Sequence, residues 1–346
     1  MKIIIALLMF SIIILFHELG HFLLAKKNGI RVNEFSLGLG PTLFGFKKGE
    51  TLYSLKLLPF GGACMMEGED SDENGDGSFN SKSVWARISV VAAGPIFNFI
   101  MAFVFSFIII ASVGYDLPVL VDVSEGYAAE EAGLQAGDTI IKLGNKRIHF
   151  YRDISSYSTY HAGEAVEVVY ERDGERYTTT LEPKYDEEYG RYLYGFVGNP
   201  NREKHTNNVF TLAKYSAYEV KYWISTTIEG LKMMFTGGVT LNDMSGPVGI
   251  VDAIGDSYEA SVSYGAFQAF LQMLYICVLL SANLGVMNLL PIPALDGGRL
   301  VFLVIEAIRG KRVDPNKEGF VHFIGIVLLL GLMVVVMFND IRKLFM

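Results

Sequence analysis

Hydrophobic residues are gathered into four long blocks along the 346-residue chain instead of being spread evenly. Each block approaches the roughly 20 apolar residues with which a helix crosses the hydrocarbon of a bilayer. The pattern predicts four transmembrane helices, the last of them the shortest, at 3–25, 88–113, 267–290 and 321–338. The first block follows Met1-Lys2 and could instead be a signal peptide, but no small-x-small cleavage site precedes Lys26.

Strand-like segments at 35–40 and 51–57 follow the first block and predict a membrane-associated β region at 31–65. Apolar strands beside a membrane helix are tolerated where they are buried in protein or line a cavity. A free strand edge there could accept an extended peptide by β-augmentation, and the alternative is a plain cytoplasmic hairpin. The acidic stretch 67–78 has half of a calcium-loop pattern but lacks its closing glutamate, because Ser81 stands there, so we expect a solvated loop.

The segment between the second and third blocks has the pattern of a soluble domain. Gly133-Leu134-Gln135-Ala136-Gly137-Asp138 separates a short helical stretch from a strand. Strands at 165–172 and 176–182 follow, joined by the turn Arg172-Asp173-Gly174-Glu175. This resembles a PDZ domain of the bacterial HtrA type and predicts one such domain at 118–183.

The remainder of this segment, 184–263, is expected to be an extracytoplasmic linker. Its helix at 209–235 carries too many charges to span a bilayer and is predicted to lie at the interface as an amphipathic helix. The predicted fold class is a polytopic α-helical membrane protein of about four transmembrane helices, with a membrane-associated β-hairpin region and an inserted extracytoplasmic PDZ domain of the α+β type. The membrane core is divided into 1–113 and 264–346.

Charge narrows the function classes and predicts an orientation. A net charge of −8 argues against nucleic acid as a partner. Cys64 and Cys277 form neither a disulfide framework nor a C-x-x-C site, so we expect free thiols. Lysine and arginine mark the cytoplasmic side of membrane proteins, and they crowd the segments after the first and third blocks. Those segments are therefore expected inside and the PDZ domain and both termini outside, although Arg342 and Lys343 mildly oppose this.

Three ionisable side chains interrupt the first apolar block, in His17-Glu18-Leu19-Gly20-His21. On a helix His17 and His21 lie one turn apart on one face, where both imidazoles can bind one Zn²⁺. Glu18 is adjacent and free to act as a general base toward water. A chance pentapeptide is the alternative, but ionisable groups are costly in a bilayer and indicate function.

A second motif ends the third block, with two prolines and two glycines that unwind the helix at membrane depth. A catalytic zinc needs a third protein ligand and one open position. Asp296 lies toward the cytoplasmic end of its segment, as the histidines do, and is the predicted third ligand. Glu306 is the rival, but it lies a turn from Arg309, where an ion pair is the simpler interpretation.

Together these motifs resemble the site-2 protease family of zinc intramembrane metalloproteases, specifically its bacterial RseP/RasP group. The resemblance rests on His17–His21, on Gly94-Pro95-Ile96-Phe97-Asn98, on the PDZ domain and on the stretch from Asn288 to Gly297. Gly38-Leu39-Gly40 and Phe338-Asn339-Asp340 are similar to that group as well. The likeness covers essentially the whole chain, although some members have two PDZ domains in tandem and this chain has one.

The resemblance implies a zinc metalloendopeptidase of the bacterial cytoplasmic membrane that performs regulated intramembrane proteolysis. It implies His17, His21 and Asp296 as Zn²⁺ ligands and Glu18 as the catalytic base. The substrates would be single-pass membrane proteins such as anti-sigma factors, or remnant signal peptides, after a first cut by an upstream site-1 protease. Candidates for contacts with the substrate or its oxyanion are Asn288, which matches a family asparagine, and Pro291, Pro293, Gly38 and Gly40.

Several alternatives stay open. Asn98 either supports the metal site or caps a helix kink. A zinc transporter would also hold metal ligands within a bundle, but it has no use for Glu18 or a PDZ domain. An idle PDZ scaffold with a structural zinc would normally offer four protein ligands, whereas three are evident here. The PDZ domain itself is expected to select substrates, by binding a trimmed C-terminus as a strand or, as we favour, by excluding bulky ectodomains.

Overall fold

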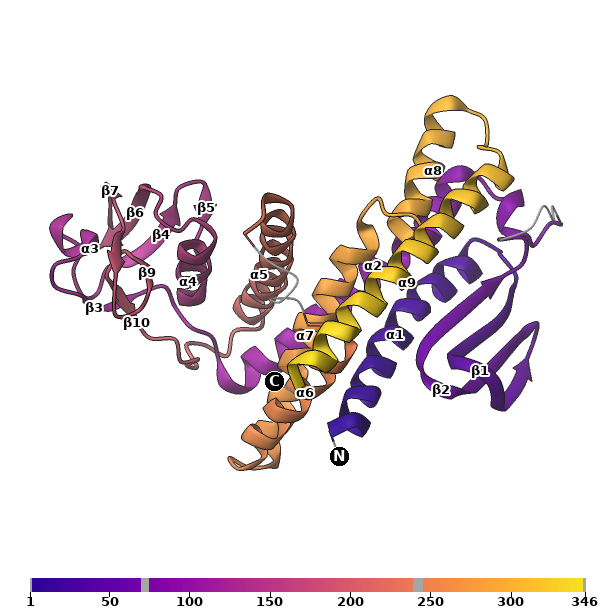
Figure 1. Ribbon diagram of the computed structural model, residues 1–346, viewed down its shortest axis with the longest axis horizontal. Coiled ribbons are helices and arrows are strands. Elements are labelled where there is room, and N and C mark those ends of the chain that lie inside the picture. The colour runs from indigo at the N-terminus through magenta and orange to yellow at the C-terminus, as the bar shows by residue number, and fades with distance from the viewer. Residues whose placement is uncertain (1, 70–74, 239–244, 345–346) are drawn as a thin grey trace. The chain divides into compact units, whose positions relative to one another are not determined.

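The computed structural model describes residues 2–69, 75–238 and 245–344 (Figure 1). It divides into two compact units. Unit 1 comprises Met1–Ser106 and Met234–Met346, and unit 2 comprises Phe107–Met233. The predicted half of a calcium loop, at 70–75, falls mostly on residues outside the described ranges.

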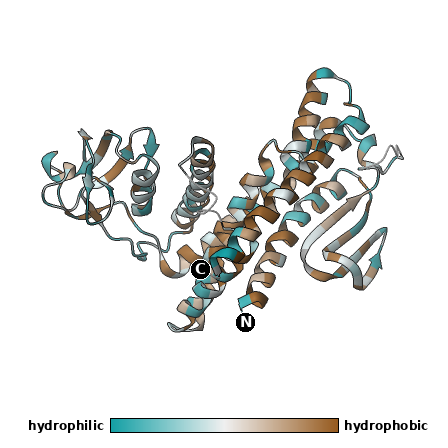
Figure 2. Cartoon of the chain, viewed as in Figure 1, coloured by the Kyte–Doolittle hydropathy of each residue, from teal (hydrophilic) through white to brown (hydrophobic). Residues whose placement is uncertain are grey.

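Four helices within the described ranges are long and apolar enough to cross a membrane, which confirms the four predicted blocks. They are α1 (Lys2–Lys27), α2 (Val84–Val113), α7 (Ala266–Leu289) and α9 (Pro315–Leu344). Brown, hydrophobic residues predominate along them in Figure 2. The chain is therefore an integral membrane protein. Helix α9 extends past the predicted 321–338 at both ends, and its first residue is a proline, whose missing N–H is harmless at the start of a helix.

The β region after α1 is one long antiparallel hairpin of β1 (Val32–Lys48) and β2 (Thr51–Met66). Its strands are longer than predicted because irregularities in register accommodate the glycines and prolines inside them. The base of the hairpin is buried against α1 and α2 in a cluster that includes Ala25, Val32, Met66 and Val90. Its far end is apolar and exposed at Leu43, Phe44 and Phe46. A one-turn 3-10 helix, η1 (Phe79–Ser81), follows before α2.

Two further helices of unit 1 were not predicted. Helix α6 (Pro247–Val262) occupies part of the segment that the sequence suggested was a linker. The buried carboxylate of Asp340, on α9, accepts hydrogen bonds of 2.9 Å from the backbone N–H groups of Gly246 and Gly249, and so caps the start of α6. At the other end of the chain, the Lys2 ammonium lies 2.5 Å from the Asp256 carboxylate of α6.

Helix α8 (Asp296–Arg309) is the second unpredicted element, and it begins at the proposed third ligand. It ends at Gly310, whose φ of 66° is the left-handed conformation common at helix C-termini. Glu306 of α8 pairs with Arg87 of α2. Glu306 is thus an ion-pair residue, as expected, but its partner is Arg87 and not the neighbouring Arg309.

Unit 2 contains a four-stranded antiparallel sheet in the order β5-β4-β6-β7 and two further strand pairs, β3 with β10 and β8 with β9. The elements in chain order are β3 (Leu120–Val123), α3 (Ala128–Glu131), β4 (Thr139–Leu143), β5 (Lys146–Arg147), α4 (Tyr151–Tyr160), β6 (Val166–Arg172), β7 (Glu175–Leu181), β8 (Lys184–Asp186), β9 (Arg191–Leu193), β10 (Phe196–Gly198) and α5 (Val209–Thr236). Because β10 pairs with β3, this domain extends to at least Gly198, past the predicted end at 183.

Helix α5 is joined to this domain by a buried ionic cluster. The Glu219 carboxylate of α5 contacts the guanidinium groups of Arg152 and Arg202, the latter at 3.2 Å. Arg152 also lies 3.6 Å from the buried carboxylate of Asp116. Two cations and two anions are thus matched inside unit 2, and they hold the predicted amphipathic helix against α4.

Candidate metal centre

Helices α1 and α2 approach each other closely at small residues. A Cβ atom built on Gly20 of α1 would lie 2.4 Å from the carbonyl oxygen of Ala93. On α2, a Cβ atom on Gly94, the residue after Ala93, would lie 2.3 Å from Nε2 of His21 and 2.7 Å from Cε1 of His17. Glycine at both positions therefore lets the helices touch and leaves space for two imidazoles between them.

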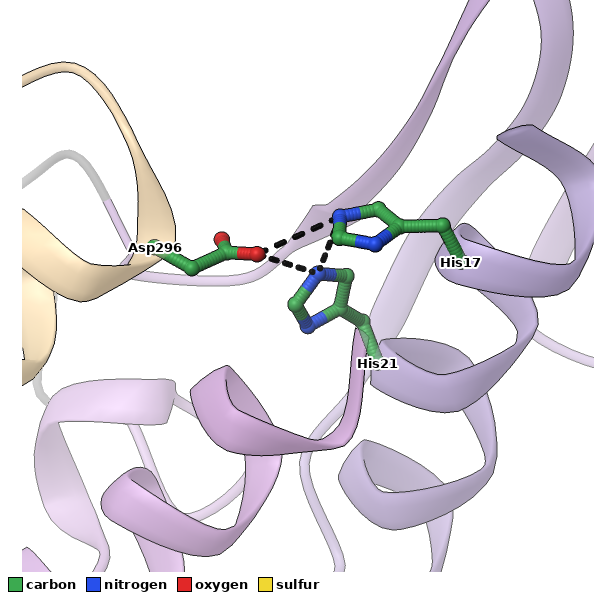
Figure 3. A group of neighbouring side chains, drawn as sticks. All are labelled: His17, His21 and Asp296. Atoms are coloured by element: carbon green, nitrogen blue, oxygen red, sulfur yellow. Dashed lines mark hydrogen bonds and ion pairs between the residues drawn. The ribbon is translucent and has the colours of Figure 1, made fainter. Parts of the chain in front are cut away.

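Three side chains converge at this contact, two from α1 and one from the first residue of α8 (Figure 3). The Nε2 atoms of His17 and His21 lie 3.3 Å apart. Oδ2 of Asp296 lies 3.2 Å from Nε2 of His17 and 3.5 Å from Nε2 of His21. Both histidines are buried, and the three residues form a group that could hold a metal ion. The structure thus brings together all three ligands that the sequence predicted.

Contacts at the Nδ1 atoms, on the side of each ring away from Asp296, orient the two imidazoles. Nδ1 of His21 donates to the carbonyl oxygen of Val90 at 2.9 Å, and since a carbonyl can only accept, Nε2 keeps its lone pair. The buried amide of Asn98 lies 3.2 Å from Nδ1 of His17. The atom nearest the ring is the amide nitrogen Nδ2, while the buried Oδ1 has no hydrogen-bond partner among the described residues. If the amide is turned by half a turn, its oxygen accepts the Nδ1 proton and leaves the lone pair on Nε2 of His17. Asn98 therefore contacts a residue of the candidate site, which favours a supporting role over that of a helix cap.

The donor set fits zinc. Two imidazole lone pairs and a carboxylate oxygen face one another, and the buried Oδ2 of Asp296 has no hydrogen-bond donor. Electron-pair donors at such distances repel unless a cation lies between them. Zinc bonds of roughly 2.0–2.1 Å place neighbouring ligands of a tetrahedron about 3.3 Å apart. The three observed separations, 3.2, 3.3 and 3.5 Å, match that edge, and one tetrahedral position remains for a fourth ligand.

Glu18 lies beside this group without belonging to it. Its carboxylate accepts a hydrogen bond from the backbone N–H of Cys64 in β2. Its side chain packs on Gly62, where an added Cβ would come within 3.0 Å of Cγ of Glu18. Neither Gly62 nor Cys64 was expected at the site, because nothing in their local sequence indicates that β2 passes α1 at this turn.

The predicted substrate-contact residues differ in position. The Asn288 amide, at the end of α7, lies 3.3 Å from Nε2 of His17 and so belongs to the site. Gly38 and Gly40 lie in β1 with positive φ and pack on Leu58 of the partner strand. Pro291 and Pro293 lie in the loop that connects α7 to Asp296.

Two solved structures match about a quarter of this chain each. The PDZ domain of an SdrC-like protein from Listeria monocytogenes matches 24% of this chain and 86% of its own, at 18% identity and a TM-score of 0.22. The second domain of another Listeria protein matches 27% of this chain and 94% of its own, at 21% identity and a TM-score of 0.23.

Sequence comparisons cover nearly the whole chain. Residues 5–332 match the model of peptidase family M50. A protein of Clostridium acetobutylicum is 40% identical over 344 residues, covering 98% of this chain and 97% of its own. The zinc metalloprotease RasP of Geobacillus kaustophilus is 33% identical over 421 residues, covering 98% and 97%. The regulator of sigma-W protease RasP of Bacillus subtilis is 33% identical over 425 residues, covering 98% of both. The chain therefore belongs to peptidase family M50, the site-2 proteases, and is a zinc metalloendopeptidase of the membrane.

Proposed function

We propose that His17, His21 and Asp296 are the zinc ligands of an intramembrane endopeptidase and that Glu18 is its catalytic base. The observation that carries this proposal is the triangle of ligand atoms with the edges of a zinc tetrahedron, next to a carboxylate that is not part of the triangle. The triangle lies between apolar helices, so the bond that is cut belongs to a chain within the bilayer.

Each side chain has a distinct role in hydrolysis. Bound zinc supplies a Lewis acid that acidifies water and polarises a carbonyl group. Glu18 removes a proton from the attacking water and returns it to the nitrogen of the departing amine, so the proton balance closes. The N–H₂ group of Asn288 donates a hydrogen bond to the developing oxyanion or to the substrate backbone. Val90 and Asn98 keep the imidazoles in the tautomer that presents Nε2.

The substrate is a single-pass membrane protein, such as a membrane-bound anti-sigma factor or a remnant signal peptide, after an upstream protease has trimmed its outer part. The name of the Bacillus subtilis relative, a regulator of sigma-W protease, supports the first class. A transmembrane helix hides its carbonyl groups in its own hydrogen bonds and must unwind before hydrolysis. The β1–β2 hairpin, which reaches Glu18 through β2, holds the unwound segment as an added strand.

The protein lies in the bacterial cytoplasmic membrane with its active site toward the cytoplasm and unit 2 outside. The basic residues that support this orientation include Lys26 and Lys27, at the end of α1, and Arg309, at the end of α8. A cysteine replacing Gly174 should react with an impermeant thiol reagent on intact cells, and one replacing Lys311 should not. Equal labelling of the two would contradict the orientation.

Two variants test the active site with two readouts, zinc content and cleavage of a trimmed membrane substrate. Glu18→Gln keeps every ligand and should retain zinc while cleavage is lost. Asp296→Ala removes a ligand and should lose both. If Asp296→Ala keeps full zinc occupancy and activity, the third ligand lies elsewhere.

Unit 2 acts as a steric filter that excludes untrimmed ectodomains. A cavity of about 360 Å³ between α4 and residues 191–196 offers the alternative, a groove for a peptide end. Ser155 lines this cavity, so Ser155→Trp places a large side chain in it. Because Ser155 is exposed, the substitution should not disturb the core of the domain, and the overall size of the domain stays the same. A filter predicts unchanged cleavage of trimmed substrates by this variant, and deletion of 118–198 should then admit untrimmed ones. Loss of cleavage in the folded Ser155→Trp variant would instead make the groove a required site.

A further inference from the structure

The loop that leads to Asp296 contains a turn with an unusual residue. Pro293 and Ala294 are the central residues of a β-turn, which the N–H of Leu295 closes by donating to the carbonyl of Ile292 at 3.2 Å. Ala294 has a φ of 81°. Proline at the second position and a positive φ at the third define a type II turn, whose third residue is usually glycine or asparagine. Alanine is disfavoured there because its Cβ crowds the backbone.

His322 of α9 makes the contact that selects this turn. Its Nδ1 accepts a hydrogen bond of 2.9 Å from the backbone N–H of Ala294. That N–H belongs to the central peptide of the turn, which points to opposite faces in type I and type II turns. An acceptor on α9 therefore stabilises type II against type I, which needs no positive φ. The His322 ring also packs near Phe302 of α8, with ring centroids 5.7 Å apart.

The backbone around the turn is closely packed, so its conformation is transmitted to α8. A Cβ atom on Gly325 of α9 would lie 2.5 Å from the carbonyl oxygen of Pro293. On the other side, a Cβ atom on Gly298 would lie 2.4 Å from the carbonyl oxygen of Ile292. Only Leu295 separates Ala294 from Asp296. A flip of the central peptide would therefore redirect the chain at the point where the carboxylate is presented.

We propose that His322 is a positioning residue for the metal centre. By accepting the N–H of Ala294 it holds the type II turn that directs Oδ2 of Asp296 toward His17 and His21. The inference rests on the proposed role of Asp296 as a zinc ligand. His322 lies outside both zinc motifs and acts only through the backbone of the turn.

The test compares zinc affinity, measured by dialysis against a competing chelator, in purified full-length variants. His322→Phe keeps a ring but removes the acceptor, and Ala294→Val leaves His322 intact but disfavours positive φ. Both should weaken zinc binding by about 10-fold or more, the range of losses for groups that orient ligands. His322→Asn, which offers an oxygen near the position of Nδ1, should stay within about 3-fold of wild type on the same scale.

The decisive variant is the double substitution His322→Phe with Ala294→Gly. Glycine adopts positive φ without strain, so it should restore most of the zinc affinity that His322→Phe loses. A loss caused by general disruption of α9 would not be restored, because glycine adds no contact. Wild-type affinity in both His322→Phe and Ala294→Val, or no recovery in the double variant, would overturn the proposal.

Two reference variants separate this proposal from the one on which it rests. Phe323→Leu, at an exposed neighbour on α9, should leave zinc affinity unchanged. Asp296→Ala should abolish zinc binding. If Asp296→Ala retains zinc, the proposed ligand set fails; if it loses zinc while His322→Phe and Ala294→Val do not, only the role of His322 fails.

Discussion

Two buried clusters of ionisable side chains, one in each unit, differ in whether the chain itself matches their charges. In unit 2, Asp116 and Glu219 face Arg152 and Arg202, so each sign has a partner from the same chain. In unit 1, two imidazole nitrogens and the carboxylate of Asp296 face one another without a cationic side chain among them. The first arrangement has charges of both signs within the chain and suits a role in folding, whereas the second has the donor atoms of a site that could hold a metal ion.

The largest expected effect comes from filling the space that Gly94 leaves beside the imidazoles of His17 and His21. In Gly94→Ala the new Cβ would lie 2.3 Å from Nε2 of His21, so an imidazole must leave its position. We expect zinc affinity and cleavage to fall by at least about 100-fold, the upper range for disturbed ligand orientation. Metal analysis and a cleavage assay measure this. Gly331→Ala, in α9 with no atom within 4 Å of the added Cβ, is the matched control and should behave as wild type.

A substitution in the ionic cluster of unit 2 should lower the stability of that unit and leave the zinc content of the protein unchanged. Glu219→Gln removes the buried carboxylate that two partly buried guanidinium groups share, and breaking a buried ion pair costs about 3–5 kcal/mol. Thermal unfolding and protease sensitivity of unit 2 report this change. Glu229→Gln, in an exposed pair with Lys232 on the same helix, is the control and should cost under about 1 kcal/mol. A drop in zinc occupancy in Glu219→Gln would contradict the separation of the two clusters.

Asn98→Ala should have a smaller effect on the metal centre than Gly94→Ala. It removes the amide beside Nδ1 of His17 without forcing the ring to move. Zinc affinity should fall by about 10-fold, as for other partners of ligating histidines. Competition with a chelator measures the loss. An unchanged affinity would mean that the His17 orientation is determined by packing alone.

The smallest effect is a pH dependence of unit 2. Burial, followed by the charge of Lys221, lowers the pKa of His149, although Asp153 opposes this and Lys214 and Arg147 add to it. The unfolded chain, with a pKa near 6.5, then binds more protons, so stability falls as pH drops from about 6.5 toward the lower folded value. Thermal unfolding at several pH values should show the slope, and His149→Phe, which keeps a ring to stack on Tyr218, should reduce it.

The sequence predicted the grouping of His17, His21 and Asp296 better than it predicted the chain around them. His17 and His21 could be placed together because helix periodicity alone puts them on one face. Asp296 could be placed by its depth and its resemblance to a known motif. The roles of Val90, Gly62 and Cys64 could not be predicted, because they depend on which backbone passes the site.

The unpredicted parts of the fold share a dependence on distant residues. Helices α6 and α8 lack the long apolar runs that reveal membrane helices, and α8 starts in a glycine pair that looks like a break. The partner of Glu306 is 219 residues away at Arg87, and β10 pairs with a strand over 70 residues earlier. The positive φ of Ala294 could not be predicted from the sequence, because alanine is not typical of turns. The group that accepts a hydrogen bond from its backbone N–H is the distant His322 on α9.

The cap on α6 has a consequence for biosynthesis. Asp340 follows Gly246 by 94 residues, so the capping carboxylate is synthesised well after the start of the helix that it caps. Lys2, which pairs with the same helix, is synthesised before that helix. Until α9 is inserted, the backbone N–H groups at the start of α6 have no carboxylate to accept their hydrogen bonds. Assembly of unit 1 around α6 is therefore completed only after α9 has been synthesised and inserted, and a nascent chain that ends before Asp340 lacks this cap.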